Sequence, residues 1–285
     1  SRMDGVGGFH GPGRRLRNRA GGVGGDQSAP GYGGVDFWVI KVDGAGIKQW
    51  DKTFGGTSND FLYSLYVTAD GGSVVGGYSE SPVSGNKTTA GFGGPLDAWV
   101  LKLDANGNKE WEQVHGTAVY EHVESVIHTR DGGYLLGIES YVGTGGNKTS
   151  AGIGAINYWV VKLDASGTKQ WERVEGAGTD LIHSVAQADD GGFVLGGSAG
   201  SGVGGTKVVP GFGANDYWIV KLMQTEVPVG TPAVRVNGLS NSSNAFNLFN
   251  VPSVPVTLAT TFPSGTIRYT LDGSTPTASS ALYAG

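Results

Sequence analysis

The sequence predicts an all-β protein: a propeller-like array of four-stranded antiparallel blades, followed by a second, smaller β domain. Three observations predict this fold. The chain repeats with a period of about 60 residues, each period contains four strand-like segments, and 52 of the 285 residues are glycine. That glycine content is far above the ~7% of an average protein, which favours strands joined by tight turns over helices.

The repeat is carried by the tryptophans. Trp38, Trp99, Trp159 and Trp218 follow one another at intervals of 61, 60 and 59 residues. The remaining three tryptophans, Trp50, Trp111 and Trp171, recur at intervals of 61 and 60 residues, so one period accounts for all seven. Self-similarity at a fixed period is the signature of a repeat architecture, and we expect Trp99, Trp159 and Trp218 to be buried between neighbouring repeats.

One period contains four segments with the alternation of strands. They span residues 61–69, 73–80, 97–104 and 109–116. Four antiparallel strands per period is the plan of a propeller blade, so residues 36–222 are expected to form about three and a quarter blades. The tight turn between the last two segments is expected to need a positive φ, which the repeat meets with Gly46, Gly107 and Gly167.

The same turn invites a second interpretation, because Asp104-Ala105-Asn106-Gly107-Asn108 resembles half of a calcium loop. The equivalent turns of the other repeats keep the glycine and lose the ligands, which favours a hairpin. The loop between the second and third segments, about 16 residues with Gly-Asn-Lys-Thr and Gly-Phe-Gly motifs, is expected to be an exposed spacer. Such loops can also carry function.

Composition and charge exclude several functional classes. The chain has no cysteine, which rules out disulfides, thiolate metal sites and a cysteine nucleophile. Its net charge is −5, and five arginines within residues 1–20 conceal a body that is more acidic still. An acidic surface with isolated lysines argues against nucleic-acid binding. No apolar run approaches the ~18 residues of a membrane span.

The segment Asp97-Ala98-Trp99-Val100-Leu101-Lys102-Leu103-Asp104, with the Asp-Gly-Gly turns that follow the first segment of each repeat, resembles the propeller-like repeats of about 60 residues in large secreted and surface proteins of Bacteroidetes and related bacteria. We assign residues 21–226 to this repeat domain. The resemblance implies export and a role in display or adhesion, and it implies no catalytic residue.

The repeat stops near Val227, where Pro, Ser, Thr and Asn become frequent. Residues 231–285 contain Tyr269-Thr270-Leu271-Asp272-Gly273-Ser274-Thr275-Pro276, which resembles the hairpin motif of the immunoglobulin-like module found at the C-terminus of chitobiases and hexosaminidases. The resemblance implies a partial, truncated Ig-like β-sandwich that assists carbohydrate-active or surface proteins. At the other end, residues 1–20 are expected to be irregular or to form a degenerate half-blade.

Candidate metal ligands recur once per repeat. Asp60, Glu121 and Asp180 occupy equivalent positions at the start of the first strand of each period, so pseudo-symmetry could arrange them in an arc around a Ca²⁺ ion, which prefers oxygen ligands. Alternatively, each carboxylate accepts hydrogen bonds from the backbone N–H groups of the glycine-rich turn before it. The repetition predicts both arrangements equally well.

Candidate acid–base groups lie on the same strands. By period two, His122, Glu124 and His128 share one strand face, and His183 takes the place of Glu124 in the next repeat. An imidazole beside a carboxylate is a usable general base, although solvated histidines on strands are common.

These patterns favour a secreted or cell-surface protein that binds or displays glycans, with a polysaccharide as partner. The alternative is a calcium-dependent propeller hydrolase acting on small lactones or esters. In that case His122 and His183 would be the catalytic bases, and the metal would polarise the carbonyl group.

Overall fold

The computed structural model describes residues 27–200 and 202–222 in full and, outside these ranges, the backbone of several short strands. The chain divides into two compact units, Ser1–Met223 and Gln224–Gly285. Every described element is a strand, so the all-β prediction is confirmed. Among the described residues, no helix is long and apolar enough to cross a membrane. The irregular linker that the sequence predicts at about 224–232 lies outside the described residues.

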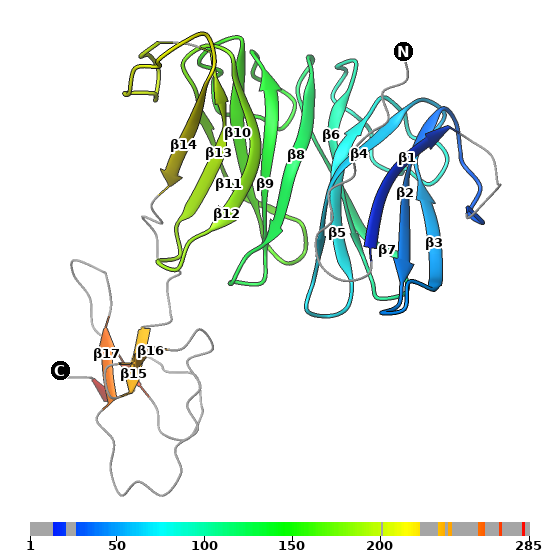
Figure 1. The fold of residues 1–285 in the computed structure, drawn as a ribbon, viewed down its shortest axis with the longest axis horizontal. Coiled ribbons are helices and arrows are strands. Elements are labelled where there is room, and N and C mark those ends of the chain that lie inside the picture. The colour runs from blue at the N-terminus through cyan, green and yellow to red at the C-terminus, as the bar shows by residue number, and fades with distance from the viewer. Residues whose placement is uncertain are drawn as a thin grey trace, which may run out of the picture. The chain divides into compact units, whose positions relative to one another are not determined.

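The first unit consists of four antiparallel sheets in chain order (Figure 1). The first sheet contains β1 (Arg14–Ala20), β2 (Val35–Val42) and β3 (Lys48–Phe54). The second contains β4 (Asp60–Val67), β5 (Ser73–Ser79), β6 (Asp97–Leu103) and β7 (Lys109–His115). The third contains β8 (Glu121–His128), β9 (Tyr134–Tyr141), β10 (Ile156–Leu163) and β11 (Lys169–Glu175). The fourth contains β12 (Asp180–Gln187), β13 (Phe193–Ala199) and β14 (Asp216–Leu222).

The predicted blades are therefore present as two four-stranded sheets between two three-stranded ones. The expectation that residues 1–20 are irregular is wrong for Arg14–Ala20, which forms β1 and pairs antiparallel with β2 along its whole length. Since β2 carries Trp38 and so corresponds to β6, β1 takes the place of a second strand. This agrees with the alternative of a degenerate half-blade.

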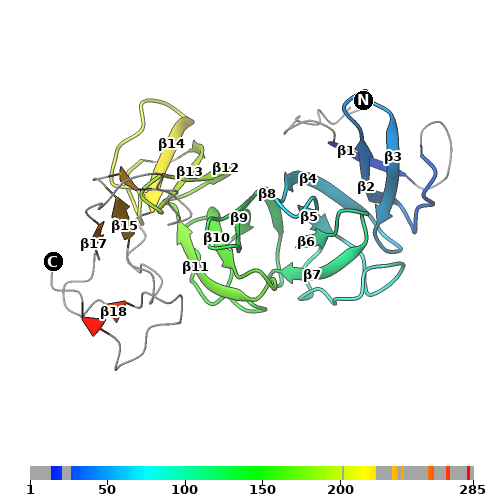
Figure 2. The same ribbon diagram turned by 90° about the horizontal axis from the view of Figure 1, so that it is seen from below.

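The sheets pack face to face in sequence order. The first strands of the last three sheets, β4, β8 and β12, contact one another in succession and are called here the inner strands. Figure 2 looks along the strands and shows the inner strands on one side of the row, with β7 and β11 on the other. Successive sheets enclose one apolar cluster each, and the clusters contain Trp99, Trp159 and Trp218. The tryptophans are buried between sheets, as the period predicted.

The hairpin interpretation of the Asp-x-x-Gly turns is also confirmed. Gly46, Gly107 and Gly167 have φ of 82°, 78° and 85°, a region that favours glycine. The carboxylate of Asp104 accepts hydrogen bonds from the backbone N–H groups of Asn106 and Asn108, both at 2.8 Å. The carboxylate thus closes the turn.

The long glycine-rich loops are anchors as well as spacers. The amide of Asn147 accepts a hydrogen bond from the N–H of Gly116 at 3.0 Å and donates one to the carbonyl of Val114 at 2.8 Å. Val114 belongs to β7 of the preceding sheet and Gly116 directly follows that strand. Asn86 bonds Gly55, which directly follows β3, in the same way. Each loop also buries one lysine almost completely; these are Lys87, Lys148 and Lys207.

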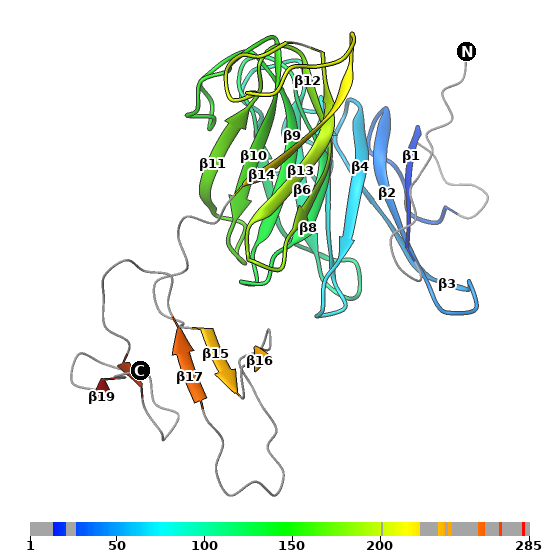
Figure 3. The same ribbon diagram turned by 60° about the vertical axis from the view of Figure 1, so that its left-hand side comes forward.

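The second unit is described through short strands only. They are β15 (Ala233–Val236), β16 (Leu239–Ser240), β17 (Val256–Ala259), β18 (Arg268–Tyr269) and β19 (Ala281–Leu282). β15 pairs antiparallel with both β16 and β17 (Figure 3). β18, which holds the Tyr269 of the predicted hairpin motif, pairs with β19. This antiparallel pairing is consistent with a partial β-sandwich.

Candidate functional site

The three predicted metal ligands are buried in the junctions between sheets. Asp60, Glu121 and Asp180 are each the first residue of an inner strand and have no exposed surface. Both carboxylate oxygens of Glu121 accept hydrogen bonds from Thr117, from its N–H at 2.9 Å and from its hydroxyl at 2.7 Å. Asp60 and Asp180 likewise accept N–H groups of the turn before them, from Gly56, Ala177 and Gly178.

A second side chain faces each of these carboxylates from the preceding sheet. Asp97 lies opposite Glu121, and burial together with the charge of Glu121 raises the pKa of Asp97 to about 6. The buried Lys148 offsets this negative charge: burial lowers the pKa of Lys148 and the charge of Glu121 opposes that shift. This sheet junction therefore buries a carboxyl pair with a lysine beside it.

Asp60, Glu121 and Asp180 are therefore not brought together. Within the described ranges, only one group of three metal-capable side chains has its ligand atoms within 4.8 Å of one another, and it consists of other residues. The predicted calcium arc has no support in this geometry, which matches the alternative of turn-capping carboxylates.

The inner strands carry a different set of side chains on their accessible positions. Each inner strand has a β-bulge, and the unpaired residue at the bulge is Tyr63, Glu124 or His183. The residues before and after each bulge are nearly constant, with Ser64, Ser125 and Ser184 following it. The bulge residue itself changes chemistry completely between repeats.

The positions beside each bulge vary as well. On the second sheet they are Phe61 and Tyr78, on the third His122 and Glu139, and on the fourth Leu181 and Ser198, each a cross-strand pair. We call these pairs and the three bulge residues the variable row. The core residues of the sheets repeat from one sheet to the next, whereas the residues of the variable row do not, which indicates that packing does not determine them. Bulges are also frequent beside functional sites.

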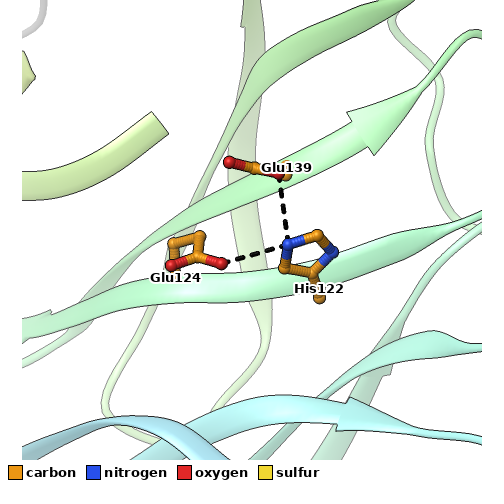
Figure 4. Close-up of side chains that lie close together, drawn as sticks. All are labelled: His122, Glu124 and Glu139. Carbon is orange, nitrogen blue, oxygen red and sulfur yellow. Dashed lines mark ion pairs between the residues drawn. The ribbon is translucent and has the colours of Figure 1, made fainter. Parts of the chain in front are cut away.

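The chemically richest part of this row is a triad on the third sheet, His122, Glu124 and Glu139. Figure 4 shows the imidazole directed between the two carboxylates. His122 Nε2 lies 3.0 Å from Glu124 Oε1 and 3.2 Å from Glu139 Oε2. Burial alone lowers the pKa of His122, but hydrogen bonds to the two carboxylates outweigh it and raise the pKa to about 9. The imidazole is therefore a cation at neutral pH.

Aromatic side chains of the second sheet adjoin the triad. The ring of His122 lies 5.9 Å from that of Tyr63 and 6.2 Å from that of Tyr78, between ring centroids. Tyr63 and Tyr78 are 5.8 Å apart, and Phe61 packs against Tyr78 at 5.2 Å. Tyr63 is 45% exposed, so an accessible aromatic surface borders the charged groups.

Of the two predicted catalytic histidines, only His122 joins this cluster. His183 is the exposed bulge residue of β12. His128, predicted on the same strand face as His122, instead packs between Tyr66 and Tyr134, at 6.4 and 5.5 Å between centroids. The sequence interpretation missed Glu139, whose proximity to His122 comes from the register of β8 against β9.

One segment of the second unit is similar to a known domain. Residues 250–285 match the family model of the chitobiase/beta-hexosaminidase C-terminal domain, so this segment is similar to that domain. No curated protein matches the chain. One solved structure, a protein of unknown function from Bacteroides caccae, is similar at 11% identity with a TM-score of 0.35; the match covers 66% of this chain and 55% of that one.

Proposed function

We propose that this protein is secreted or displayed on the cell surface and binds glycans, with the variable row of the inner strands as the binding surface. The observation that carries the proposal is that the exposed Tyr63 and the half-buried Tyr78 pack beside the imidazole of His122. That imidazole is in turn paired with the carboxylates of Glu124 and Glu139.

Sugars bind both to aromatic rings and to hydrogen-bonding polar groups. The C–H face of a pyranose ring packs against an aromatic face, for which Tyr63 offers a large amphipathic ring at low entropic cost. Sugar hydroxyls are hydrogen-bond donors, and ionised carboxylates are strong acceptors. A few convergent polar groups beside aromatic side chains are the usual composition of a small-molecule site.

The C-terminal match supports the same class of ligand, because residues 250–285 are similar to a domain named after chitin- and hexosamine-processing enzymes. The alternative from the sequence, calcium-dependent hydrolysis of lactones or esters, lacks a comparable observation, since the carboxylates that it needs are used in the sheet junctions.

The test is binding to a panel of soluble polysaccharides and chito-oligosaccharides, measured by affinity electrophoresis and then by calorimetry for each ligand retained. We expect Tyr63→Ala to weaken binding at least tenfold. Tyr32→Ala is the matched control, because Tyr32 is a similarly exposed tyrosine, at 41%, and lies between β1 and β2, outside the variable row. Retention of full affinity by Tyr63→Ala, or no binding to any glycan, would refute the proposal.

A further inference from the structure

The His122 triad contains one more negative charge than its own groups can neutralise. His122 Nε2 carries a single proton, which it can donate fully to only one of the two carboxylates 3.0 and 3.2 Å away. With the imidazole protonated, the three groups sum to −1. Among the described residues, no Lys or Arg forms an ion pair with Glu124 or Glu139. The triad is therefore short of positive charge.

The burial of the triad increases the cost of that excess charge. Glu139 is 7% exposed, and His122 and Glu124 are half-buried. The neighbouring side chains across the sheet junction are Tyr63 and Tyr78, which bring no positive charge. An unbalanced carboxylate in such a place is costly unless a cation joins it.

The geometry suits a particular kind of cation. The nitrogen and the two carboxylate oxygens lie within 4.8 Å of one another, and two of the three separations are 3.0 and 3.2 Å. Ligands at about 2.0–2.2 Å around a tetrahedral Zn²⁺ ion are about 3.3–3.5 Å apart. The remaining separation can close by rotation of the Glu124 side chain, which sits at a bulge on the accessible side of β8.

The donor set narrows the class of ion. An imidazole nitrogen is a ligand that suits Zn²⁺ and other first-row divalent ions, whereas Ca²⁺ prefers six to eight oxygens. Three protein ligands leave a fourth position for water or another oxygen donor, as in open zinc sites. The ligands are held by neighbouring strands, because Glu139 is the register partner of His122.

We propose that His122, Glu124 and Glu139 form a binding site for one divalent transition-metal ion of the zinc class. Binding exchanges the imidazolium proton for the metal: the proton leaves Nε2 for solvent, the Nε2 lone pair binds the ion, and the net charge of the site changes from −1 to 0. The proposal does not depend on glycan binding, and either can fail without the other.

The experiment is calorimetric titration of the full chain with ZnCl₂, in two buffers of different ionisation enthalpy so that released protons are counted. We expect one ion bound with a dissociation constant in the micromolar range or below, and release of close to one proton at pH 7. Glu139→Gln, which keeps the shape of the side chain, should weaken binding at least tenfold, and His122→Asn should do the same.

His183→Asn is the matched control, because it removes a histidine from the equivalent bulge region of the fourth sheet. It should bind zinc as the unaltered chain does. Circular dichroism without metal verifies that each variant is folded; if His122→Asn does not fold, the isosteric Glu139→Gln and Glu124→Gln decide. Absence of zinc binding, unchanged affinity in the glutamine variants, or an equal loss in His183→Asn would overturn the proposal.

Discussion

The hydroxyl oxygen of Ser64, on β4, accepts a hydrogen bond from the backbone N–H of Val126, on β8, at 2.9 Å. The next junction repeats the contact, with Ser125 accepting from the N–H of Val185 at 3.2 Å. Each serine directly follows a bulge. The bulge therefore has two effects: it turns a variable side chain outward and directs the following serine at the next sheet.

Loss of this contact should weaken the junction. We expect Ser64→Ala to lower the free energy of unfolding by about 1 kcal/mol, the usual net value of one such hydrogen bond. Urea denaturation measures the change. Ser184→Ala, at the equivalent but exposed position of the fourth sheet, should change the value by less than about 0.5 kcal/mol; equal losses would show that the serines act within their own sheets.

Removal of a buried indole should have a larger effect. Trp159 has no exposed surface and is in contact with His115 and with the ammonium group of Lys148, 5.5 Å from its ring centroid. We expect Trp159→Ala to cost about 3–5 kcal/mol of unfolding free energy. Tyr217→Ala, on the accessible face of β14, is the control and should be nearly neutral. A small effect at Trp159 would contradict face-to-face packing of the sheets.

The buried carboxyl pairs predict a specific pH dependence. The pKa of Asp97 is raised from 3.8 to about 6, so the folded state holds a proton that the unfolded state releases. Stability from this proton is complete below about pH 4 and is lost as the pH rises to about 6. We expect Asp97→Asn to flatten this part of the stability curve and to add roughly 3 kcal/mol at pH 7.

The junction between the third and fourth sheets supplies the reciprocal variant. There Asn157 occupies the position that Asp97 has between the second and third sheets. Asn157→Asp should introduce the same decline between pH 4 and 6 and lower the stability at pH 7. Chemical denaturation at several pH values measures both variants. If stability fell more steeply between pH 4 and 6 in Asp97→Asn than in the unaltered chain, folding would not raise the pKa of Asp97.

The loop anchors can be tested by proteolysis. Asn147 makes two hydrogen bonds to the preceding sheet, so Asn147→Ala should release the loop at 142–155 and cost about 1–2 kcal/mol. Limited digestion, followed by mass spectrometry, should then find cleavage in this loop first. Asn106→Ala, in an exposed hairpin turn, serves as the control. Unchanged cleavage would show that the loop is held by other contacts, such as the buried Lys148.

The period of the sequence was sufficient to predict the sheets, the buried tryptophans and the hairpin turns, because each depends on residues close together in the chain. The cluster at His122 depends on a cross-strand register that places Glu139 opposite it, and no local pattern specifies that register. The buried lysines were missed for a similar reason: a Gly-Asn-Lys-Thr loop is polar by composition, and only the folded sheet brings carboxylates near the ammonium groups. These are Asp60 and Glu112 for Lys87, and Glu121 and Glu172 for Lys148.

The bulges can be recognised in the sequence from the spacing of apolar residues, which departs from the simple alternation of a regular strand. Leu62 and Leu65, like Val123 and Val126, are apolar residues three positions apart on one strand, and all four are buried. In a regular strand such residues would point to opposite faces. An inserted residue restores both to the core, so this spacing identifies the bulge and the residue that it exposes.

The loop anchors also have a mechanical consequence. Each loop leaves its own sheet, is fastened to the sheet before it through Asn86 or Asn147, and returns. A tensile force along the chain would therefore act on these hydrogen bonds and on the inner-strand contacts at the same time. One sheet could separate from the next only after both sets of contacts had broken. Such coupling would raise the force needed to extend the array without adding to its apolar core.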